Sequence, residues 1–317
     1  MADGARSTPL EPGPALAAHP LRCLFLATRP AFLTITAVGV LLGLALATFQ
    51  GAPLRPVEAV LTLLLAVITH AGANALNDYY DAGNGSDAAN TERLYPFTGG
   101  SRFIQNGILP AARVGRLGAT LLAGVMIPGL WLVAGSGTGL LLIGLAGLLL
   151  AWAYSAPPLK LASRGLGEIA VSLSWSLVVL GTDYVQRGQW HPAPVWAGLG
   201  YGLMVANLLY LNQFPDATAD ARAGKRTLVV RLGRRRAVTG YGLILSAALA
   251  LPVATVATRV QPATALLCLA AALPALAAWW HLRQNAGNPA GLRPAIKLTL
   301  IATHLYGLLL AAGYLLG

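Results

Sequence analysis

Long, unbroken apolar segments limit what this chain can fold into more than any other feature. With a mean hydropathy of +0.63, the chain is too apolar for an ordinary soluble core. Backbone groups in lipid must be satisfied within the chain, so we expect an all-α polytopic membrane protein, a bundle of about nine transmembrane helices of roughly 17 to 25 residues each. The expected spans are 31–49, 57–76, 117–134, 138–154, 167–184, 195–212, 237–257, 262–280 and 296–315.

The basic residues are distributed unevenly between the connections that join these spans. The N-terminal segment and the connections after the second, fourth, sixth and eighth spans hold 19 of the 22 Lys and Arg residues, and the other side holds only Arg55, Arg187 and Arg259. An excess of Lys and Arg marks the cytoplasmic side, so we expect a cytoplasmic N-terminus and a C-terminus outside. The formal net charge of +11 is therefore a signal of topology and does not indicate a nucleic-acid partner.

The first residues differ in composition from the rest of the chain. Residues 1–21 are rich in Pro, Ala and Gly and are expected to form a disordered cytosolic tail, without the apolar core of a signal peptide. Residues 22–317 are expected to form one transmembrane domain. Cys23 and Cys268 lie far apart in apolar surroundings, so they indicate neither a disulfide framework nor a metal site.

Acidic residues are rare in this chain, yet four of the eleven fall within fifteen positions at the end of the second span. Asn77 and Asp81 lie four residues apart there, and the same spacing recurs in Asn212, Asp216 and Asp220 at the end of the sixth span. Residues four apart share one face of a helix, so each segment should present an amide and a carboxylate side by side. Both clusters are expected at the cytoplasmic surface.

Clustered carboxylates repel one another unless a cation lies between them. Oxygen ligands without nearby His or Cys suit Mg²⁺, which typically links protein carboxylates to substrate phosphates. We therefore expect a magnesium and diphosphate site, to which neighbouring Lys and Arg residues add positive charge. Asp87 and Glu92, taken singly, are equally compatible with solvated loop positions. The predicted metal ligands are Asn77, Asp78, Asp81, Asp87, Asp216 and Asp220.

A third polar segment, YSAPPLK, follows the fourth span on the same side. Its two prolines should end the helix near Ser155, because proline cannot continue the hydrogen-bond ladder. Tyr154, Ser155 and Lys160 would then lie beside both acidic clusters. A proline-terminated loop with an interfacial tyrosine would give the same pattern.

The segments NDYYD, YSAPPLK and DATADARAGKRTL resemble the three cytoplasmic motifs of the UbiA superfamily of intramembrane prenyltransferases, in order and in approximate separation. The resemblance extends from about residue 22 to the end of the chain. It implies a helical bundle whose cavity opens laterally to lipid, where two Asp-rich motifs hold Mg²⁺ and a polyprenyl diphosphate. It also implies catalytic roles for Tyr154, Ser155 and Lys160, and diphosphate binding by Lys160, Lys225, Arg226 and Arg29.

One position departs from the family pattern. The first motif usually continues with an Asp four residues after the one at position 81, but here Gly85 stands there and the next carboxylate is Asp87. Either Asp87 reaches the metal through the turn, or water replaces the missing ligand. This spacing and the segments 95–109 and 178–188 resemble the menaquinone branch of the family, which prenylates 1,4-dihydroxy-2-naphthoate with loss of CO₂.

The implied activity is transfer of a polyprenyl group to a small aromatic acceptor, at the cytoplasmic face of the cell inner (plasma) membrane. Arg102 and Asn74 are candidate contacts for the acceptor, although a topology charge explains Arg102 equally well. Other acceptors stay open: 4-hydroxybenzoate, a porphyrin, a chlorophyllide or a lipid alcohol. A membrane transporter is the alternative from another class, but transporter acids usually lie near the bilayer midplane and not at helix ends.

Three further polar residues are left without a role in the site. His70 is expected to be a buried hydrogen-bonding group on the polar face of the second span. Glu168 opens the fifth span, where the helix dipole favours an acid. Asp183 is expected to be a solvated residue at the outer end of that span.

Overall fold

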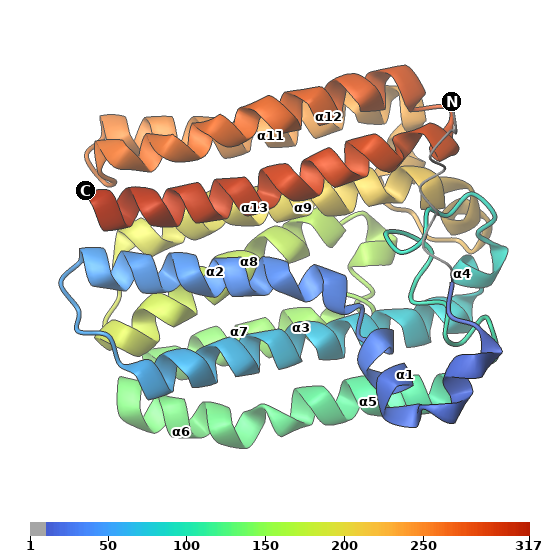
Figure 1. Ribbon diagram of the computed structural model, residues 1–317, viewed down its shortest axis with the longest axis horizontal. Helices are drawn as coiled ribbons and strands as arrows, with labels where there is room; N and C mark the ends of the chain where they lie inside the picture. Colours follow the sequence, from blue (N-terminus) through green and yellow to red (C-terminus); the bar gives the residue numbers. More distant parts are fainter. Residues whose placement is uncertain (1–10) are drawn as a thin grey trace, which may run out of the picture.

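The computed structural model describes residues 11–317, and within that range it contains helices and turns but no strand. Most of the residues lie in long helices that run the length of the molecule (Figure 1). The α-helices are α1 Pro20–Ala27, α2 Pro30–Phe49, α3 Pro56–Asn84, α4 Ser86–Ala89, α5 Ala111–Gly124, α6 Met126–Ser136, α7 Gly139–Ala153, α8 Gly167–Arg187, α9 Pro192–Arg222, α10 Leu228–Leu232, α11 Arg234–Ala257, α12 Ala272–Asn285 and α13 Arg293–Leu316. Four short 3₁₀ helices are η1 Pro14–Ala18, η2 Ala162–Arg164, η3 Ala263–Ala271 and η4 Pro289–Leu292.

Eight helical segments in the described residues are long and apolar enough to cross a membrane. The fourth predicted span, 138–154, forms α7, whose 15 residues fall short of the roughly 20 that a straight span needs. The predicted all-α membrane architecture is confirmed, with eight long segments and one shorter apolar helix.

Prolines account for breaks inside two of the predicted spans. Pro128 has no N–H to donate to the carbonyl of Gly124, and the helix is interrupted at Val125 between α5 and α6. Pro274 likewise cannot donate to Ala270, and the chain changes there from η3 to α12. Each pair still forms one continuous apolar segment, Ala111–Ser136 and Ala263–Asn285.

The long helices alternate in direction, so their connections gather at two ends (Figure 1). The connections after α3, α7, α9 and α12 lie at the end that carries α4, which we call the polar end. The connection between α2 and α3 and the C-terminus lie at the other end, which we call the opposite end. The acidic motifs at the ends of α3 and α9 therefore meet at the same end of the bundle.

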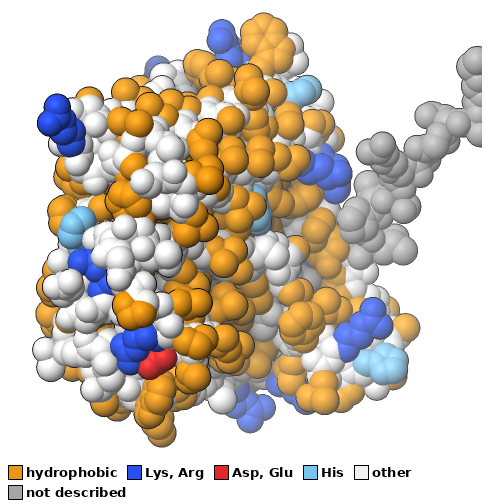
Figure 2. All heavy atoms as spheres, turned by 60° about the vertical axis from the view of Figure 1, so that its left-hand side comes forward, with side chains coloured by type: hydrophobic (Ala, Val, Ile, Leu, Met, Phe, Trp, Pro, Cys, Tyr) orange, Lys and Arg blue, Asp and Glu red, His pale blue; other side chains and the backbone are white. Residues whose placement is uncertain are grey.

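Close approach of small residues packs the helices against one another. A Cβ at Gly202 of α9 would stand 2.2 Å from the carbonyl oxygen of Ser172 in α8, so only glycine allows this contact. Large apolar side chains such as Ile127 and Leu243 are 81% and 66% exposed. Figure 2 shows apolar side chains over much of the face in view, with the Lys and Arg groups mainly toward its rim. This surface suits lipid as the surrounding solvent.

The structure differs from the prediction of a disordered tail over residues 1–21. Residues 1–10 lie outside the described residues, but residues 11–21 contain η1 and the start of α1. Leu16 packs on the small core formed by Cys23, Phe103 and Leu109, and the thiol of Cys23 donates to the Leu16 carbonyl (3.0 Å). Burial of these apolar groups offsets the entropy of ordering this segment, which is rich in Pro and Ala. Both cysteines are buried and unbonded to each other, as predicted.

Candidate active site

The bundle encloses a cavity of about 470 Å³ between α2, α3, α7, α8 and α9. It follows α3 from Asp81 to Thr62, 19 residues that correspond to about 28 Å of helix. Most of its lining is aliphatic or aromatic, and all of its charged lining residues lie toward the polar end. They are Arg29, Asp81, Asp87, Asp216, Asp220 and Lys225. The cavity is therefore apolar along its length and acidic at one end.

The first acidic motif lies on the last turns of α3. Asn77 donates from Nδ2 to Asp81 Oδ2 (3.0 Å) and to the hydroxyl of Ser155 (3.1 Å). The expected side-by-side placement of amide and carboxylate is thus confirmed, and Ser155 joins them from the connection after α7. Asn84 donates to the other oxygen of Asp81 (3.1 Å), so that this carboxylate has a fixed orientation.

Asp87 reaches the same cavity through a turn that begins at Gly85. Gly85 has a left-handed backbone conformation (φ +81°), which costs glycine little, and it turns the chain from α3 into α4. Asp87 is 7% exposed and lines the cavity together with Asp81. Burial, and then the carboxylates of Asp81 and Asp78, raise the pKa of Asp87 well above its ordinary value. A cation bound here would relieve that repulsion.

Asp78 occupies a different position from the other carboxylates. It follows Asn77 by one residue, about 100° around the helix, and does not line the cavity. Its Oδ2 accepts from the backbone N–H of Ser101 (3.0 Å) and thereby holds the 99–102 turn. Gly100 lies between two acids, since a Cβ there would stand 2.4 Å from Asp87 Oδ2 and 3.2 Å from Asp78 Oδ1.

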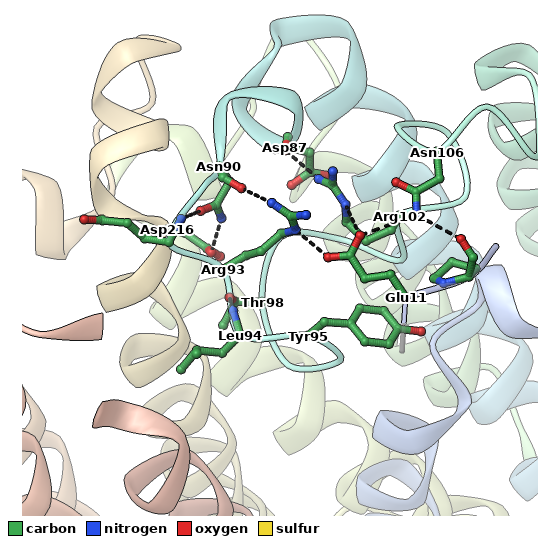
Figure 3. A network of polar contacts seen from close by, with 12 residues as sticks. Glu11, Asp87, Asn90, Arg93, Leu94, Tyr95, Thr98, Arg102, Asn106 and Asp216 are labelled. Carbon is green, nitrogen blue, oxygen red and sulfur yellow. Dashed lines mark hydrogen bonds and ion pairs between the residues drawn. The ribbon is translucent and has the colours of Figure 1, made fainter. Parts of the chain in front are cut away.

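The second acidic motif faces the first across the cavity. Asp216 and Asp220 project from α9, and Asn90 donates to Asp216 Oδ1 (2.6 Å) (Figure 3). The ammonium of Lys225 lies between the motifs, 3.0 Å from Asp81 Oδ2 and 3.1 Å from Asp220 Oδ1. Burial alone would lower the pKa of Lys225, but Asp81 and Asp220 raise it well above its ordinary value. Lys225 therefore carries a positive charge between two carboxylates.

Other residues singled out in the sequence are divided between the cavity and its surroundings. Tyr154, Asn74 and Arg29 line the cavity. Asn74 donates to the Thr28 carbonyl (2.9 Å), and Arg29 donates to the Phe97 carbonyl (2.9 Å). The structure does not bring the remaining predicted cations to the cavity: Lys160 and Arg226 are exposed, and Arg102 is buried outside the lining.

Glu168 and Asp183, to which the sequence pattern assigns no role in the site, are both buried. Glu168 is 6% exposed and accepts from Gln213 Nε2 (2.5 Å), and Gln213 lines the cavity. The prediction for Asp183 was wrong, since it is 0% exposed and forms an ion pair with Arg187 of the same helix (3.6 Å). Arg187 at the end of α8 can reach Asp183 because the two residues are four apart.

Sequence reasoning missed Asn90 and Gln213. Asn90 follows α4 and lies 126 residues before its partner Asp216, so no local spacing could have paired them. Gln213 lies between Asn212 and Asp216 and was overlooked because the four-residue pattern passes over it. His70 behaves as predicted: it lines the cavity and its Nδ1 forms a hydrogen bond with Thr36 (2.8 Å).

The charges around the cavity fit a bound cation. Among the described residues, four carboxylates line it against two cationic side chains, and the buried Oδ1 of Asn212 has no hydrogen-bond partner. Within residues 11–317, no three His, Cys, Asp or Glu side chains are close enough to hold one metal ion among themselves. This arrangement suits Mg²⁺, which keeps several waters and is bound through one or two carboxylates together with substrate phosphates.

Comparison with known proteins agrees with this class of membrane protein, an α-helical bundle with an acidic end to an apolar cavity. The 1,4-dihydroxy-2-naphthoate octaprenyltransferase of Escherichia coli (strain K12) is 29% identical over 91% of this chain and 93% of its own. The enzyme of the same name from Haemophilus influenzae is 30% identical over 81% of this chain and 84% of its own. A UbiA homolog from Archaeoglobus fulgidus, solved with DMAPP and Mg²⁺, has the same fold, with a TM-score of 0.56 at 15% identity over 90% of this chain and 98% of that one.

The chain matches the UbiA prenyltransferase family over residues 35–301 and belongs to that family. It is therefore an enzyme, a multi-pass membrane prenyltransferase. Membership removes the transporter alternative that the sequence left open.

Proposed function

We propose that this enzyme transfers a polyprenyl group from an allylic diphosphate to 1,4-dihydroxy-2-naphthoate, with loss of CO₂, in menaquinone biosynthesis. The observation that carries the donor half of this proposal is the acidic, lysine-containing end of a long apolar cavity. The names of the two bacterial relatives support the naphthoate acceptor. No observation favours 4-hydroxybenzoate, a porphyrin, a chlorophyllide or a lipid alcohol over it.

The polar end of the cavity is suited to the diphosphate of the donor. Asp81, Asp87, Asp216 and Asp220 would hold Mg²⁺, with Asn77 and Asn212 as neutral oxygen ligands beside them. When bound, the metal supplies positive charge that stabilises the departing diphosphate. Lys225 is charged and lies between both motifs, so it adds a hydrogen-bond donor to the same leaving group. Arg29 reaches the cavity from the start of α2 and provides the second cation.

The apolar remainder of the cavity is suited to the prenyl chain and to the allylic cation left when the carbon–oxygen bond breaks. Tyr154, Phe32, Phe97 and Trp175 supply aromatic rings to its lining. An aromatic face attracts a cation, and a lining without charged groups excludes water that would otherwise capture the cation. Burial raises the pKa of the Tyr154 phenol, so its ring acts as a neutral group.

For the acceptor, Asn74 is better placed than Arg102. Asn74 lines the cavity between His70 and Asn77, and its donation to Thr28 leaves its carbonyl oxygen able to accept from a ring hydroxyl. Arg102 lies outside the lining and donates to the backbone carbonyl of Asp87 (2.7 Å). We therefore assign Asn74 to the acceptor and give Arg102 a role in holding Asp87.

The distribution of charge supports an active site that faces the cytoplasm of the inner (plasma) membrane. Every described Lys and Arg outside Arg55, Arg187 and Arg259 belongs to the connections or helix ends at the polar end. By the positive-inside rule, that end and the N-terminus are cytoplasmic. A soluble acceptor and the diphosphate group would then enter from the cytosol.

Turnover by the purified protein tests the proposal. The protein is supplied with 1,4-dihydroxy-2-naphthoate and a polyprenyl diphosphate, with Mg²⁺ or with EDTA, and prenylated product, CO₂ and diphosphate are measured. We expect all three products with Mg²⁺ and none with EDTA. Product formed from 4-hydroxybenzoate but not from the naphthoate would overturn the acceptor assignment, and product formed equally in EDTA would overturn the metal.

A further inference from the structure

The first described residues contact the loop that carries part of the candidate site. Residues 11–19, which we call the N-terminal strap, lie against the connection 90–109 between α4 and α5 (Figure 3). The carboxylate of Glu11 accepts from Arg93 Nε (2.7 Å) and from Asn106 Nδ2 (3.4 Å), and it forms an ion pair with Arg102 Nε (3.6 Å). Asn106 also donates to the carbonyl of Pro12 (2.9 Å). The carboxylate of Glu11 thus contacts two arginines and one amide of the connection.

Both arginines that contact Glu11 also donate hydrogen bonds to residues that line the cavity. Arg93 donates from Nη1 to the backbone carbonyl of Asn90 (2.6 Å), and Asn90 in turn donates to Asp216 (2.6 Å). Arg102 donates from Nη1 to the backbone carbonyl of Asp87 (2.7 Å). Glu11 is therefore two contacts away from the backbone of Asp87, and three contacts away from the carboxylate of Asp216 (Figure 3).

The electrostatics of this cluster indicate that Glu11 is needed to hold both arginines in place. Without it, the positive charges of Arg93 and Arg102 would repel each other in a partly buried setting, and among the described residues Asp87 alone would remain as an acid that offsets the charge of Arg102. Arg102 is also held in a left-handed backbone conformation (φ +69°), which a non-glycine residue adopts only where its surroundings stabilise it. Although burial alone would raise the pKa of Glu11, Arg93 lowers it below its ordinary value, so Glu11 is charged near neutral pH.

We propose that Glu11 is a positioning residue that acts through Arg93 and Arg102 to set the places of Asn90 and Asp87 at the metal end of the cavity. This inference rests on the proposed function of that end as a magnesium and diphosphate site. It gives the N-terminal strap a part in the reaction, although no strap residue from Glu11 to His19 lines the cavity. Removal of Glu11 would loosen the 86–109 segment and weaken metal binding, with little effect on the chemical step once the metal is bound.

The test compares Glu11→Ala with Glu92→Ala in the full-length protein. Glu92 is a matched control because it also forms an ion pair with an arginine, Arg234 (2.5 Å), at the same end and with similar exposure. The other partners of Arg234, Phe214 and Thr218, do not line the cavity. Hydrogen exchange of residues 86–109 is measured without substrate, and Mg²⁺ binding is measured by calorimetry with Mg²⁺ alone.

For Glu11→Ala we expect faster exchange across 86–109 and an Mg²⁺ requirement raised about 10-fold, at the low end of effects seen for partners of metal ligands. In turnover assays kcat at saturating Mg²⁺ should stay within about twofold of the wild type, while the KM for the diphosphate rises. Glu11→Asp should restore much of the Mg²⁺ affinity, because it keeps the charge. Glu92→Ala removes an ion pair within the same segment, so faster exchange is expected only next to residue 92, and the Mg²⁺ requirement should stay unchanged.

Two results would overturn the proposal. Unchanged exchange in Glu11→Ala would show that the contact does not restrain the loop. Faster exchange with an unchanged Mg²⁺ requirement would show a purely structural strap. If the wild-type protein neither binds Mg²⁺ nor needs it for turnover, the proposed function itself fails, and the exchange data alone then decide whether Glu11 restrains the loop.

Discussion

Buried or half-buried acidic residues occur at both ends of the bundle, with different surroundings. At the opposite end, Glu58 faces Arg55 (2.5 Å) and Asp183 faces Arg187 (3.6 Å), so each carboxylate has its own arginine. Arg55 also donates to the backbone carbonyl of Val185 in α8 (3.0 Å). At the polar end, four carboxylates line the cavity against Arg29 and Lys225.

The pairing of charges distinguishes carboxylates with a structural role from carboxylates that are suited to bind a cation. A buried ion pair with matched charges satisfies its own members and leaves nothing to bind. An excess of carboxylates at a cavity raises the free energy of the empty site, and a bound cation lowers it. The balance of charge, more than burial, therefore identifies the functional end. The predictions below test that distinction.

The largest effect should follow loss of a carboxylate at the polar end. We expect Asp81→Asn or Asp216→Asn to lower turnover by about 10³-fold or more at saturating Mg²⁺, because each removes charge that holds the cation opposite the departing diphosphate. Product formation in detergent measures this, with size-exclusion chromatography and circular dichroism to establish that the variants fold. Near-normal turnover by either variant would show that the acidic excess at this end has no part in the chemistry.

Asp87 should have a smaller effect, since it lies beside Asp81 at the cavity but comes after the turn at Gly85. We expect Asp87→Asn to lower turnover about 10- to 100-fold at low Mg²⁺ and to raise the Mg²⁺ concentration needed for the half-maximal rate. A titration of rate against Mg²⁺ measures both. The control is Glu92→Gln, an acid of the same connection that does not line the cavity. An unchanged Mg²⁺ requirement in Asp87→Asn would mean that water fills the ligand position missing at Gly85.

Local patterns predicted much of this site, and long-range contacts supplied the rest. The four-residue spacing of Asn77 and Asp81 fixes their shared helix face, and the structure confirms it. The place of Lys225 depends on how the turn after α9 folds back, because its partner Asp81 lies 144 residues away. No periodicity contains that information. Lys160 shows the converse: its motif resembles a catalytic one, yet its side chain is exposed.

The same limit explains the errors elsewhere in the fold. Apolar runs identified every long helix, because lipid requires them, but they could not show that α7 is short. Asp183 was placed in solvent because it ends an apolar span, whereas Gln50 from the connection after α2 covers it and donates to its Oδ1 (3.3 Å). The strap was expected to be disordered because it is rich in Pro, Ala and Gly and has no apolar core, and its contact with Arg93 spans 82 residues.

If the prenyl chain runs along the apolar part of the cavity toward the opposite end, a large side chain on α3 should block long donors only. Ala66 lines the cavity 15 residues before Asp81, about 22 Å along the helix. We expect Ala66→Phe to lower turnover with a long polyprenyl diphosphate roughly 10-fold, since overfilling a packed space costs about 1–3 kcal/mol. Turnover with geranyl diphosphate should stay unchanged, because its shorter chain ends before Ala66. Leu64→Phe, on a neighbouring turn and 51% exposed to lipid, is the control. Equal loss with both donors would mean that the chain does not run toward the opposite end.

The smallest effect on activity should come from the balanced cluster. We expect Asp183→Asn to keep turnover within about twofold of the wild type and to lower the free energy of unfolding by about 1–3 kcal/mol, because Arg187 is left buried without its acid. Thermal unfolding in detergent measures the loss. The double variant Asp183→Asn with Arg187→Gln should recover part of it, since neither charge then remains unpaired. If Asp183→Asn reduced turnover as severely as Asp81→Asn while the protein stayed folded, charge balance would not separate the two ends, and the opposite end would have to take part in the reaction.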